Sequence, residues 1–480
     1  MSQSFPEKPV LQSGHDNLKS RALKGGAYIV IRQGLGMVLS LIGVLFVTRL
    51  IGPTEYGIYA ACYGVLAFIG TVGTWGIDVY LIRKPGQVES HEYNLGFTLL
   101  LLISLAFVGA VELARTTIAG LIHIPEAAKV LAGFAFYVPA QLLALPGVVQ
   151  LDRDLRFRRV AYNELASQIL NYCVAVPLAI KGAGAWAPAG GMLTQQVALL
   201  VLTYISTNFR PRLAWNTQSA REMLGYGLSY SSSIWVWQLR NLVNPVIVGR
   251  FAGATAVGNV ALAIRLTEVL SFAKNATWRV AMAALAKFGD DRNRLRRSIQ
   301  EGMRLQALTV GFPLAGFALV SAFILPPLFG HRWDPALRVF PFIALGYLTN
   351  SMFNLHSSVL YVLRENLRVT SFHAVHVVVF ALGAVLFVSR FGAVGYGLAE
   401  MLALSTYVVI HVAVVKSVGA PNYLSPALWF SVSALALAIS RGPVLLRFLG
   451  ICLLLLPLCV PRERANIVGY ARLLRPSRSA

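Results

Sequence analysis

Two arginines inside long apolar stretches are the residues of this sequence best suited to chemistry. Arg32 lies inside the apolar run 27–48, and Arg240 lies inside the run 223–248. A charged residue there costs about 2.5–3.5 kcal/mol on membrane-insertion scales, so each should face protein interior or water rather than lipid. A guanidinium has N–H donors in a fixed fork that matches the oxygens of carboxylates and phosphates. Neither arginine has an acidic residue three or four positions away, so we predict both as anion-binding cations.

A second pair of arginines belongs to a motif that occurs twice. Residues 47–60 are repeated by residues 248–261 at a constant offset of 201, so that Arg49 falls on Arg250. Each copy lies between two apolar runs, which predicts the tight turn of a helical hairpin. The glycines that the two copies share are Gly52, Gly57, Gly253 and Gly258. Hairpin capping and snorkelling toward lipid headgroups are alternative roles for this arginine pair.

Two further turns repeat in the same order along the chain. Residues 150–159 match residues 362–369 at an offset of 212, and residues 182–186 match residues 392–396 at an offset of 210. Hairpins that repeat so far apart are typical of transporters built from two related halves. Both copies of each hairpin have the same predicted orientation, so the halves should be parallel repeats.

The composition indicates a membrane protein. The 480 residues are 56% hydrophobic and only 13% charged, which is far from the composition of a soluble domain. A membrane-spanning helix needs about 20 mostly apolar residues. The sequence offers fourteen such runs, near 27–48, 57–80, 95–114, 127–150, 160–180, 185–206, 223–248, 256–272, 305–326, 337–362, 372–389, 395–415, 425–440 and 443–460. We therefore predict an all-α polytopic membrane protein with about 14 transmembrane helices.

These runs give a predicted domain organisation of two six-helix lobes and an appended helix pair. In chain order the parts are a cytoplasmic lead (1–26), an N-lobe (27–206), a cytoplasmic linker (207–222), a C-lobe (223–416), two appended spans (425–460) and a basic cytoplasmic tail (461–480).

The net charge of +22 is explained by membrane topology. With a cytoplasmic N-terminus, 29 of the 42 lysines and arginines fall in loops on the cytoplasmic side. The positive-inside rule predicts this bias, and the reverse orientation would violate it. Both termini are therefore expected in the cytoplasm. No basic-aromatic module stands apart from the membrane loops, so we expect no nucleic-acid partner.

No pattern in the sequence indicates an enzyme, a metal site or a cofactor. The cysteines fall in apolar runs without CxxC spacing, which favours buried structural thiols. They are Cys62, Cys173, Cys452 and Cys459. His373 and His376 share a helical face, but no further ligand lies at metal-binding spacing. The absence of a GxxxxGK[ST] loop excludes a P-loop ATPase within this sequence.

Four segments resemble one known family. They are the duplicated hairpin segments 48–57 and 249–258, the basic turn 154–159 and the segment 326–333, which reads Pro-Pro-Leu-Phe-Gly-His-Arg-Trp. These residues resemble the bacterial polysaccharide-biosynthesis flippases of the multidrug/oligosaccharidyl-lipid/polysaccharide exporter superfamily. The resemblance covers residues 20–416, and none of its motifs identifies a sugar.

This resemblance implies a fold, a cargo and a location. It implies two pseudo-symmetric six-helix bundles around a central cavity that opens alternately to each face of the bacterial inner membrane. The implied cargo is a polyprenyl-pyrophosphate-linked oligosaccharide, moved to the outer leaflet. Membrane lipids and the polysaccharide polymerase or export machinery are the other expected partners. A pyrophosphate must leave water to cross, so Arg32, Arg240, Arg49 and Arg250 become the candidate cavity cations.

Two carboxylates are candidates for coupling to a driving ion, and several rival functions are compatible with the sequence. Asp78 and Glu400 are the candidates for ion coupling, although the carboxylates lie toward the ends of the spans. A lipid II flippase would also have fourteen spans and a cationic cavity. A cation or drug antiporter of the multidrug branch would favour an acidic cavity. A membrane glycan polymerase or ligase would need a larger outer loop than this sequence provides.

Overall fold

A computed structural model of the chain shows an entirely helical arrangement in the part that it describes. It describes residues 10–207, 209–272, 274, 285, 291–461 and 463–465, with residues 10–33, 229 and 230 as backbone only. No strand occurs among these residues. The predicted all-α class is confirmed.

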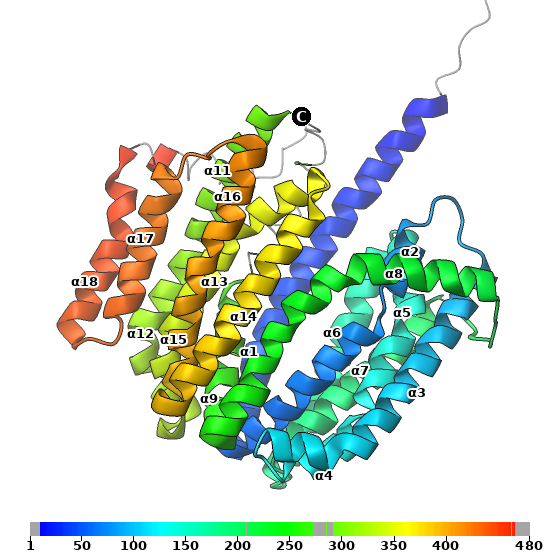
Figure 1. Cartoon of the computed structure of the whole chain (residues 1–480), viewed down its shortest axis with the longest axis horizontal. Helices are drawn as coiled ribbons and strands as arrows, with labels where there is room; N and C mark the ends of the chain where they lie inside the picture. The colour runs from blue at the N-terminus through cyan, green and yellow to red at the C-terminus, as the bar shows by residue number, and fades with distance from the viewer. Residues whose placement is uncertain are drawn as a thin grey trace, which may run out of the picture. The chain divides into compact units, whose positions relative to one another are not determined.

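Helices follow one another along the described parts of the chain (Figure 1). The first half contains α1 (Val10–Gly73), α2 (Ile77–Arg83), α3 (Ser90–Leu121), α4 (Ala127–Phe134), α5 (Tyr137–Arg153), α6 (Phe157–Ile180) and α7 (Trp186–Thr207). The second half contains α8 (Thr217–Gln238), the 3-10 turn η1 (Leu239–Leu242), the π-helical turn η2 (Val243–Val248), α9 (Gly249–Leu270), α11 (Arg292–Gln306), η3 (Ala307–Gly311), α12 (Phe312–Phe329), α13 (Asp334–Val362), α14 (Asn366–Phe391), α15 (Ala393–Ala403), α16 (Tyr407–Val418), α17 (Leu424–Ile439) and α18 (Val444–Leu455).

The duplicated motif forms two matching hairpins. α1 is broken at Gly52 (φ 77°, ψ 176°), and α9 is broken at Gly253 (φ 75°, ψ 179°). A residue with a side chain rarely adopts such a φ, so glycine is needed at both breaks. The predicted turns and their offset of 201 are confirmed.

The described helices provide about the number of spans that the sequence predicts. Eight of them are long and apolar enough to cross a membrane. Two of the eight, Gly34–Gly73 and Ser231–Leu270, contain the glycine breaks, so each supplies two legs. α6 and α13 cover the predicted runs 160–180 and 337–362. The chain is a multi-pass membrane protein.

The later repeats confirm one predicted register and correct another. Gly182 (φ 77°) and Gly392 (φ 56°) both have positive φ, at the predicted offset of 210. In the basic turns, however, the residues with positive φ are Leu155 (54°) and Arg364 (61°), an offset of 209. The predicted offset of 212 is therefore wrong, because it aligned identical side chains rather than equivalent backbone positions.

Hydrogen bonds support the corrected register of the basic turns. The Arg156 N–H donates to Leu151 O at 2.9 Å, and the Glu365 N–H donates to Leu360 O at 2.8 Å. Donor and acceptor both move by 209 residues between the two copies.

By contacts the chain divides into two compact units. The first comprises residues 1–47, 66–116 and 128–232, and the second comprises residues 48–65, 117–127 and 233–480. In the first unit α7 packs against α5 and α6. The second unit includes the tip of the first hairpin as well as the whole of the second. The lobe boundaries predicted from the sequence remain a prediction.

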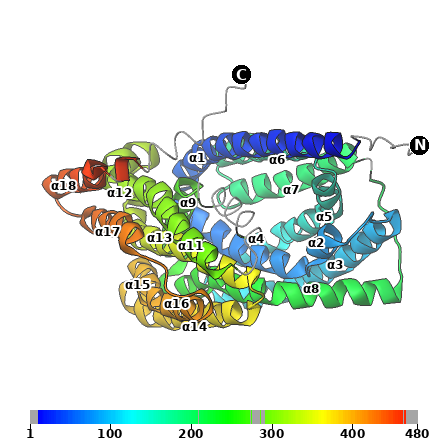
Figure 2. The ribbon, with the colours of Figure 1, turned by 90° about the horizontal axis from the view of Figure 1, so that it is seen from above.

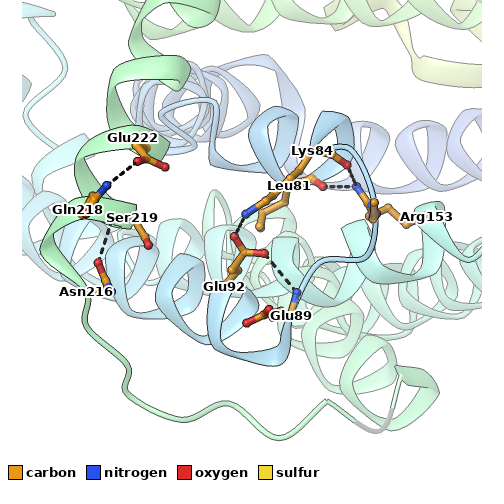
Figure 3. A network of polar contacts seen from close by, with 10 residues as sticks. Leu81, Lys84, Glu89, Glu92, Arg153, Asn216, Gln218, Ser219 and Glu222 are labelled. Carbon is orange, nitrogen blue, oxygen red and sulfur yellow. Dashed lines mark hydrogen bonds and ion pairs between the residues drawn. The ribbon is translucent and has the colours of Figure 1, made fainter.

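Arg153 joins α5 to the C-terminal end of α2 in the first unit (Figure 3). Arg153, at the C-terminus of α5, donates to the carbonyls of Leu81, Ile82 and Lys84 at 2.7–2.9 Å and to Gly86 O at 2.5 Å. The carbonyls at a helix C-terminus lack partners within the helix. The guanidinium therefore satisfies the end of α2 and ties it to α5.

The second unit carries an amphipathic helix and the appended pair. Leu295, Ile299 and Met303 of α11 are fully buried, while five of its other positions are arginines. α11 packs against α13 and α17, and α17 and α18 lie side by side against α12 (Figures 1 and 2). Most of the chain between α9 and α11 lies outside the described residues.

Candidate functional site

The helix that carries Arg240 is irregular at this residue. α8 is regular up to Gln238, and the chain then passes through η1 and η2 before α9 begins. Pro245 has no N–H to donate to the preceding turn, so the regular hydrogen-bond ladder cannot continue there. Tightened and widened turns inside a helix are frequent at functional sites. This irregularity sets the position of Arg240 within the membrane segment.

Arg240 forms an ion pair with Glu400 of α15. Arg240 Nη2 donates to Glu400 Oε1, and the two side chains are 13% and 1% exposed. The partner lies 160 residues along the chain, so no local spacing could reveal it. Glu400 in turn lies against Gly346 of α13, where an added Cβ would be 3.3 Å from its carboxylate. The pair is thus packed between helices.

Aromatic rings surround the guanidinium of Arg240. Its Cζ lies 5.4 Å from the ring centroid of Trp237 and 5.5 Å from that of Phe380. Cations at this distance from an aromatic face are stabilised by the ring's electron distribution. Arg240 Nε is buried and has no hydrogen-bond partner in the described part of the chain. Donor capacity therefore remains at this arginine after the pairing with Glu400.

Further polar side chains from α13, α16 and the end of α9 contribute to the electrostatic surroundings of the ion pair. Lys274 Nζ donates to Asn350 Oδ1, and Asn350 Nδ2 donates to the Tyr407 hydroxyl at 3.0 Å. The Tyr347 hydroxyl donates to Glu268 Oε1 at 3.3 Å. Burial, and to a lesser degree the charge of Arg240, lowers the pKa of Lys274 to about 8. We define Arg240, Glu400, Lys274, Asn350, Tyr347, Tyr407 and Glu268 as the polar cluster of the second unit.

Arg49 and Arg250 have different surroundings. Arg49 Nη1 donates to Pro327 O at 3.0 Å and to Leu328 O at 3.1 Å, near the C-terminus of α12. Arg250 is exposed at the start of α9. The sequence equivalence of the two arginines therefore does not extend to their contacts.

The remaining candidate residues are placed less completely. Arg32 lies in α1 where only the backbone is described. Asp78 lies in α2, and its Oδ1 is buried without a hydrogen-bond partner among the described residues. The structure brings Arg240 and Glu400 together and leaves Asp78 in the other unit.

The hairpin glycines are points of close backbone contact within the second unit. A Cβ added at Gly57 would lie 1.8 Å from Ala254 O, and one at Gly258 would lie 2.0 Å from Pro53 O. The Thr54 and Thr255 Oγ1 atoms are 2.8 Å apart. Small residues at such positions let two backbones approach closely. Of the four predicted motif glycines, Gly52 and Gly253 therefore form the turns, and Gly57 and Gly258 form the close backbone contact.

Sequence reasoning missed Lys274, Asn350 and the tyrosines of the polar cluster. A signal existed for Asn350, which is a polar residue inside the predicted run 337–362. His376 Nδ1 and Thr406 Oγ1 form a hydrogen bond of 2.9 Å. The ring centroids of His376 and Trp237 are 5.3 Å apart. The described residues contain no group of three or more potential metal ligands among His, Cys, Asp and Glu.

Comparison with solved structures identifies the class of protein. The inward closed conformation of the lipid II flippase MurJ matches with a TM-score of 0.69 at 14% identity, covering 94% of this chain and 100% of that structure. An inward-facing multidrug resistance MATE transporter of the MOP superfamily matches with a TM-score of 0.58 at 13% identity, covering 81% and 98%. The chain therefore has the fold of the MOP-superfamily transporters.

Sequence comparison identifies the family within that class. Residues 46–338 match the family described as polysaccharide biosynthesis protein, and the chain belongs to it. It is 24% identical to the succinoglycan biosynthesis transport protein ExoT of Rhizobium meliloti over 323 residues, which are 65% of this chain and 63% of ExoT. It is 21% identical to the lipopolysaccharide biosynthesis protein WzxC of Escherichia coli over 344 residues, 70% of this chain and 69% of WzxC. The match thus spans just under two thirds of ExoT.

Proposed function

We propose that this protein is a flippase for polyprenyl-pyrophosphate-linked oligosaccharide repeat units. It moves them from the cytoplasmic to the outer leaflet of the bacterial inner membrane for surface or exopolysaccharide assembly. The observation that carries the proposal is the buried guanidinium of Arg240 in a member of the polysaccharide biosynthesis family. A cation inside a membrane segment is costly and marks a candidate functional site, and we propose an anionic cargo as its ligand.

Arg240 has the chemistry that a pyrophosphate requires. Its ion pair uses one Nη2 donor, and its Nε–H is unpartnered among the described residues. Trp237 and Phe380 restrict the orientation of the guanidinium. A guanidinium that is held in place can donate to two oxygens of a phosphoryl group at once. Arg240 is therefore the residue proposed to hold the diphosphate.

The other elements of the mechanism follow the sequence prediction. Arg32, Arg49 and Arg250 are proposed as further cations along the path of the diphosphate. Asp78 and Glu400 are proposed as sites of ion coupling. The two repeats would expose the bound cargo alternately to each face, as in transporters with related halves. Both termini are proposed to lie in the cytoplasm.

A lipid II flippase is the second candidate function, because the MurJ fold matches over 94% of the chain. Its cargo would carry the same diphosphate chemistry, so the polar cluster does not distinguish the two. A cation or drug antiporter is supported less well, because the chain belongs to the polysaccharide biosynthesis family.

Complementation of a deletion strain tests the proposal. Loss of surface polysaccharide should be restored by the wild-type gene and not by Arg240→Gln, because the variant lacks the charged fork. Arg368→Gln is the matched control, since Arg368 pairs with Glu365 at the start of α14, outside the polar cluster. Membrane levels of each variant must be equal. Full polysaccharide output from Arg240→Gln would contradict the proposal.

A further inference from the structure

We propose that Glu400 is an internal stand-in for the anionic group of the cargo, and that the two compete for Arg240. The inference rests on the proposed function and adds a residue that sets affinity and release. The Glu400 carboxylate occupies the guanidinium, as its contact with Arg240 Nη2 shows. Carboxylate and phosphate oxygens use the same donors of the arginine fork. Cargo binding must therefore displace or share this contact.

Burial makes the stand-in necessary. An unpaired guanidinium at 13% exposure would be destabilising, because the lost hydration is not replaced. Glu400 replaces it, at 1% exposure, from a helix that also contacts α13 and α14. The carboxylate thus holds the guanidinium in place. It also lowers the net affinity for the cargo, which permits release at the outer face.

The charges around the pair leave Arg240 as the direct partner of Glu400. The titratable groups that act on Arg240 or Glu400 come from every neighbouring element. They are Tyr396 on α15, Tyr347 on α13, Tyr407 on α16, His376 on α14 and Lys274 beyond α9. Glu268 on α9 acts on Tyr347, Tyr396 and Lys274. The only hydrogen bond to the Glu400 carboxylate in the described part of the chain is the one from Arg240. Neutralising Glu400 therefore frees Arg240 directly.

Competition for one cation links the affinity for the anion to the charge of Glu400. Removing this charge leaves the Arg240 guanidinium to the anion alone, so anion binding should become tighter.

Binding of inorganic pyrophosphate to the full-length protein in nanodiscs tests the inference. Glu400→Gln keeps the shape of the side chain and removes its charge, so affinity should rise by about tenfold or more. Arg240→Gln should not bind. Glu365→Gln is the matched control, because that carboxylate pairs with Arg368 outside the polar cluster and should leave affinity unchanged.

The outcomes separate this inference from the proposed function. Equal or weaker binding by Glu400→Gln, or no binding by any form of the protein, overturns the inference even if the deletion strain loses its polysaccharide. The expected pattern in a strain whose polysaccharide is normal would retain the competition and overturn the proposed function. If Arg240→Gln is unstable because Glu400 is left unpaired, the double variant Arg240→Gln/Glu400→Gln removes both charges and should also fail to bind. Tight binding by the double variant would contradict the assignment.

Discussion

Thr54 and Thr255 lie 201 residues apart in the sequence, and their hydroxyl oxygens lie 2.8 Å apart in the structure. They occupy the same position in the two copies of the hairpin motif, so the repeat meets itself at equivalent residues. Gly57 and Gly258, three residues further along each copy, are in contact through the backbone. The duplicated motif therefore serves both as two turns and as one interface within the second unit.

Gly57→Ala or Gly258→Ala should disrupt this interface. The added methyl would lie 1.8 or 2.0 Å from a backbone oxygen, which cannot move as a flexible side chain does. Overpacking of this kind costs about 1–3 kcal/mol. We expect a lower Tm in detergent and reduced polysaccharide output. Gly316→Ala is the control, because no atom lies within 4 Å of the added methyl. Wild-type stability of all three variants would refute the close contact.

Arg49→Gln and Arg250→Gln should differ in stability, although the two residues are equivalent in sequence. Arg49 and Arg250 are both exposed, and Arg49 donates to two carbonyls near the end of α12. Loss of these charge-assisted hydrogen bonds at an exposed position costs about 1 kcal/mol. Thermal unfolding of the purified proteins should show a lower Tm for Arg49→Gln alone. Equal Tm values would mean that the capping contact contributes nothing.

Lys274 should give anion binding an alkaline limit. Burial lowers its pKa from the ordinary 10.5 to about 8, so the cluster loses a positive charge as the pH rises through about 8. Pyrophosphate affinity should fall in that range for the wild type and stay flat for Lys274→Gln. The folded state also binds fewer protons than the unfolded state between about pH 8 and 10.5, so this group makes stability rise with pH there. An unchanged alkaline limb in Lys274→Gln binding would exclude Lys274 as its source.

Arg153→Gln should weaken the first unit. The substitution removes charged donors from four carbonyls at the end of α2 and the loop that follows. Hydrogen bonds from charged groups contribute about 1.5–3 kcal/mol each in favourable cases, and partial exposure reduces this sum. We expect a loss of about 2–4 kcal/mol and faster proteolysis near residue 86. Arg158→Gln, on the following helix, is the control variant. Equal cleavage of the two variants would contradict a stabilising role of the Arg153 hydrogen bonds.

The sequence was sufficient for the elements and their repetition but not for the contacts between distant helices. Gly52 and Gly253 could be predicted as turns, because the turn requires a positive φ and both copies of the motif therefore have glycine at this position. The register of the basic turns was misjudged, because backbone geometry selects Leu155 and Arg364 while residue identity does not. The pairing of Arg240 with Glu400 depends on how α15 packs, which no local pattern encodes.

The most direct test of the central claim is mass spectrometry of the lipids extracted from a deletion strain. The account predicts that complete polyprenyl-pyrophosphate oligosaccharide units accumulate while surface polysaccharide is lost, and that the wild-type gene reverses both effects. Accumulation of peptidoglycan precursor would instead establish the lipid II function. A normal lipid profile accompanied by new drug sensitivity would contradict the flippase account and favour a multidrug transporter.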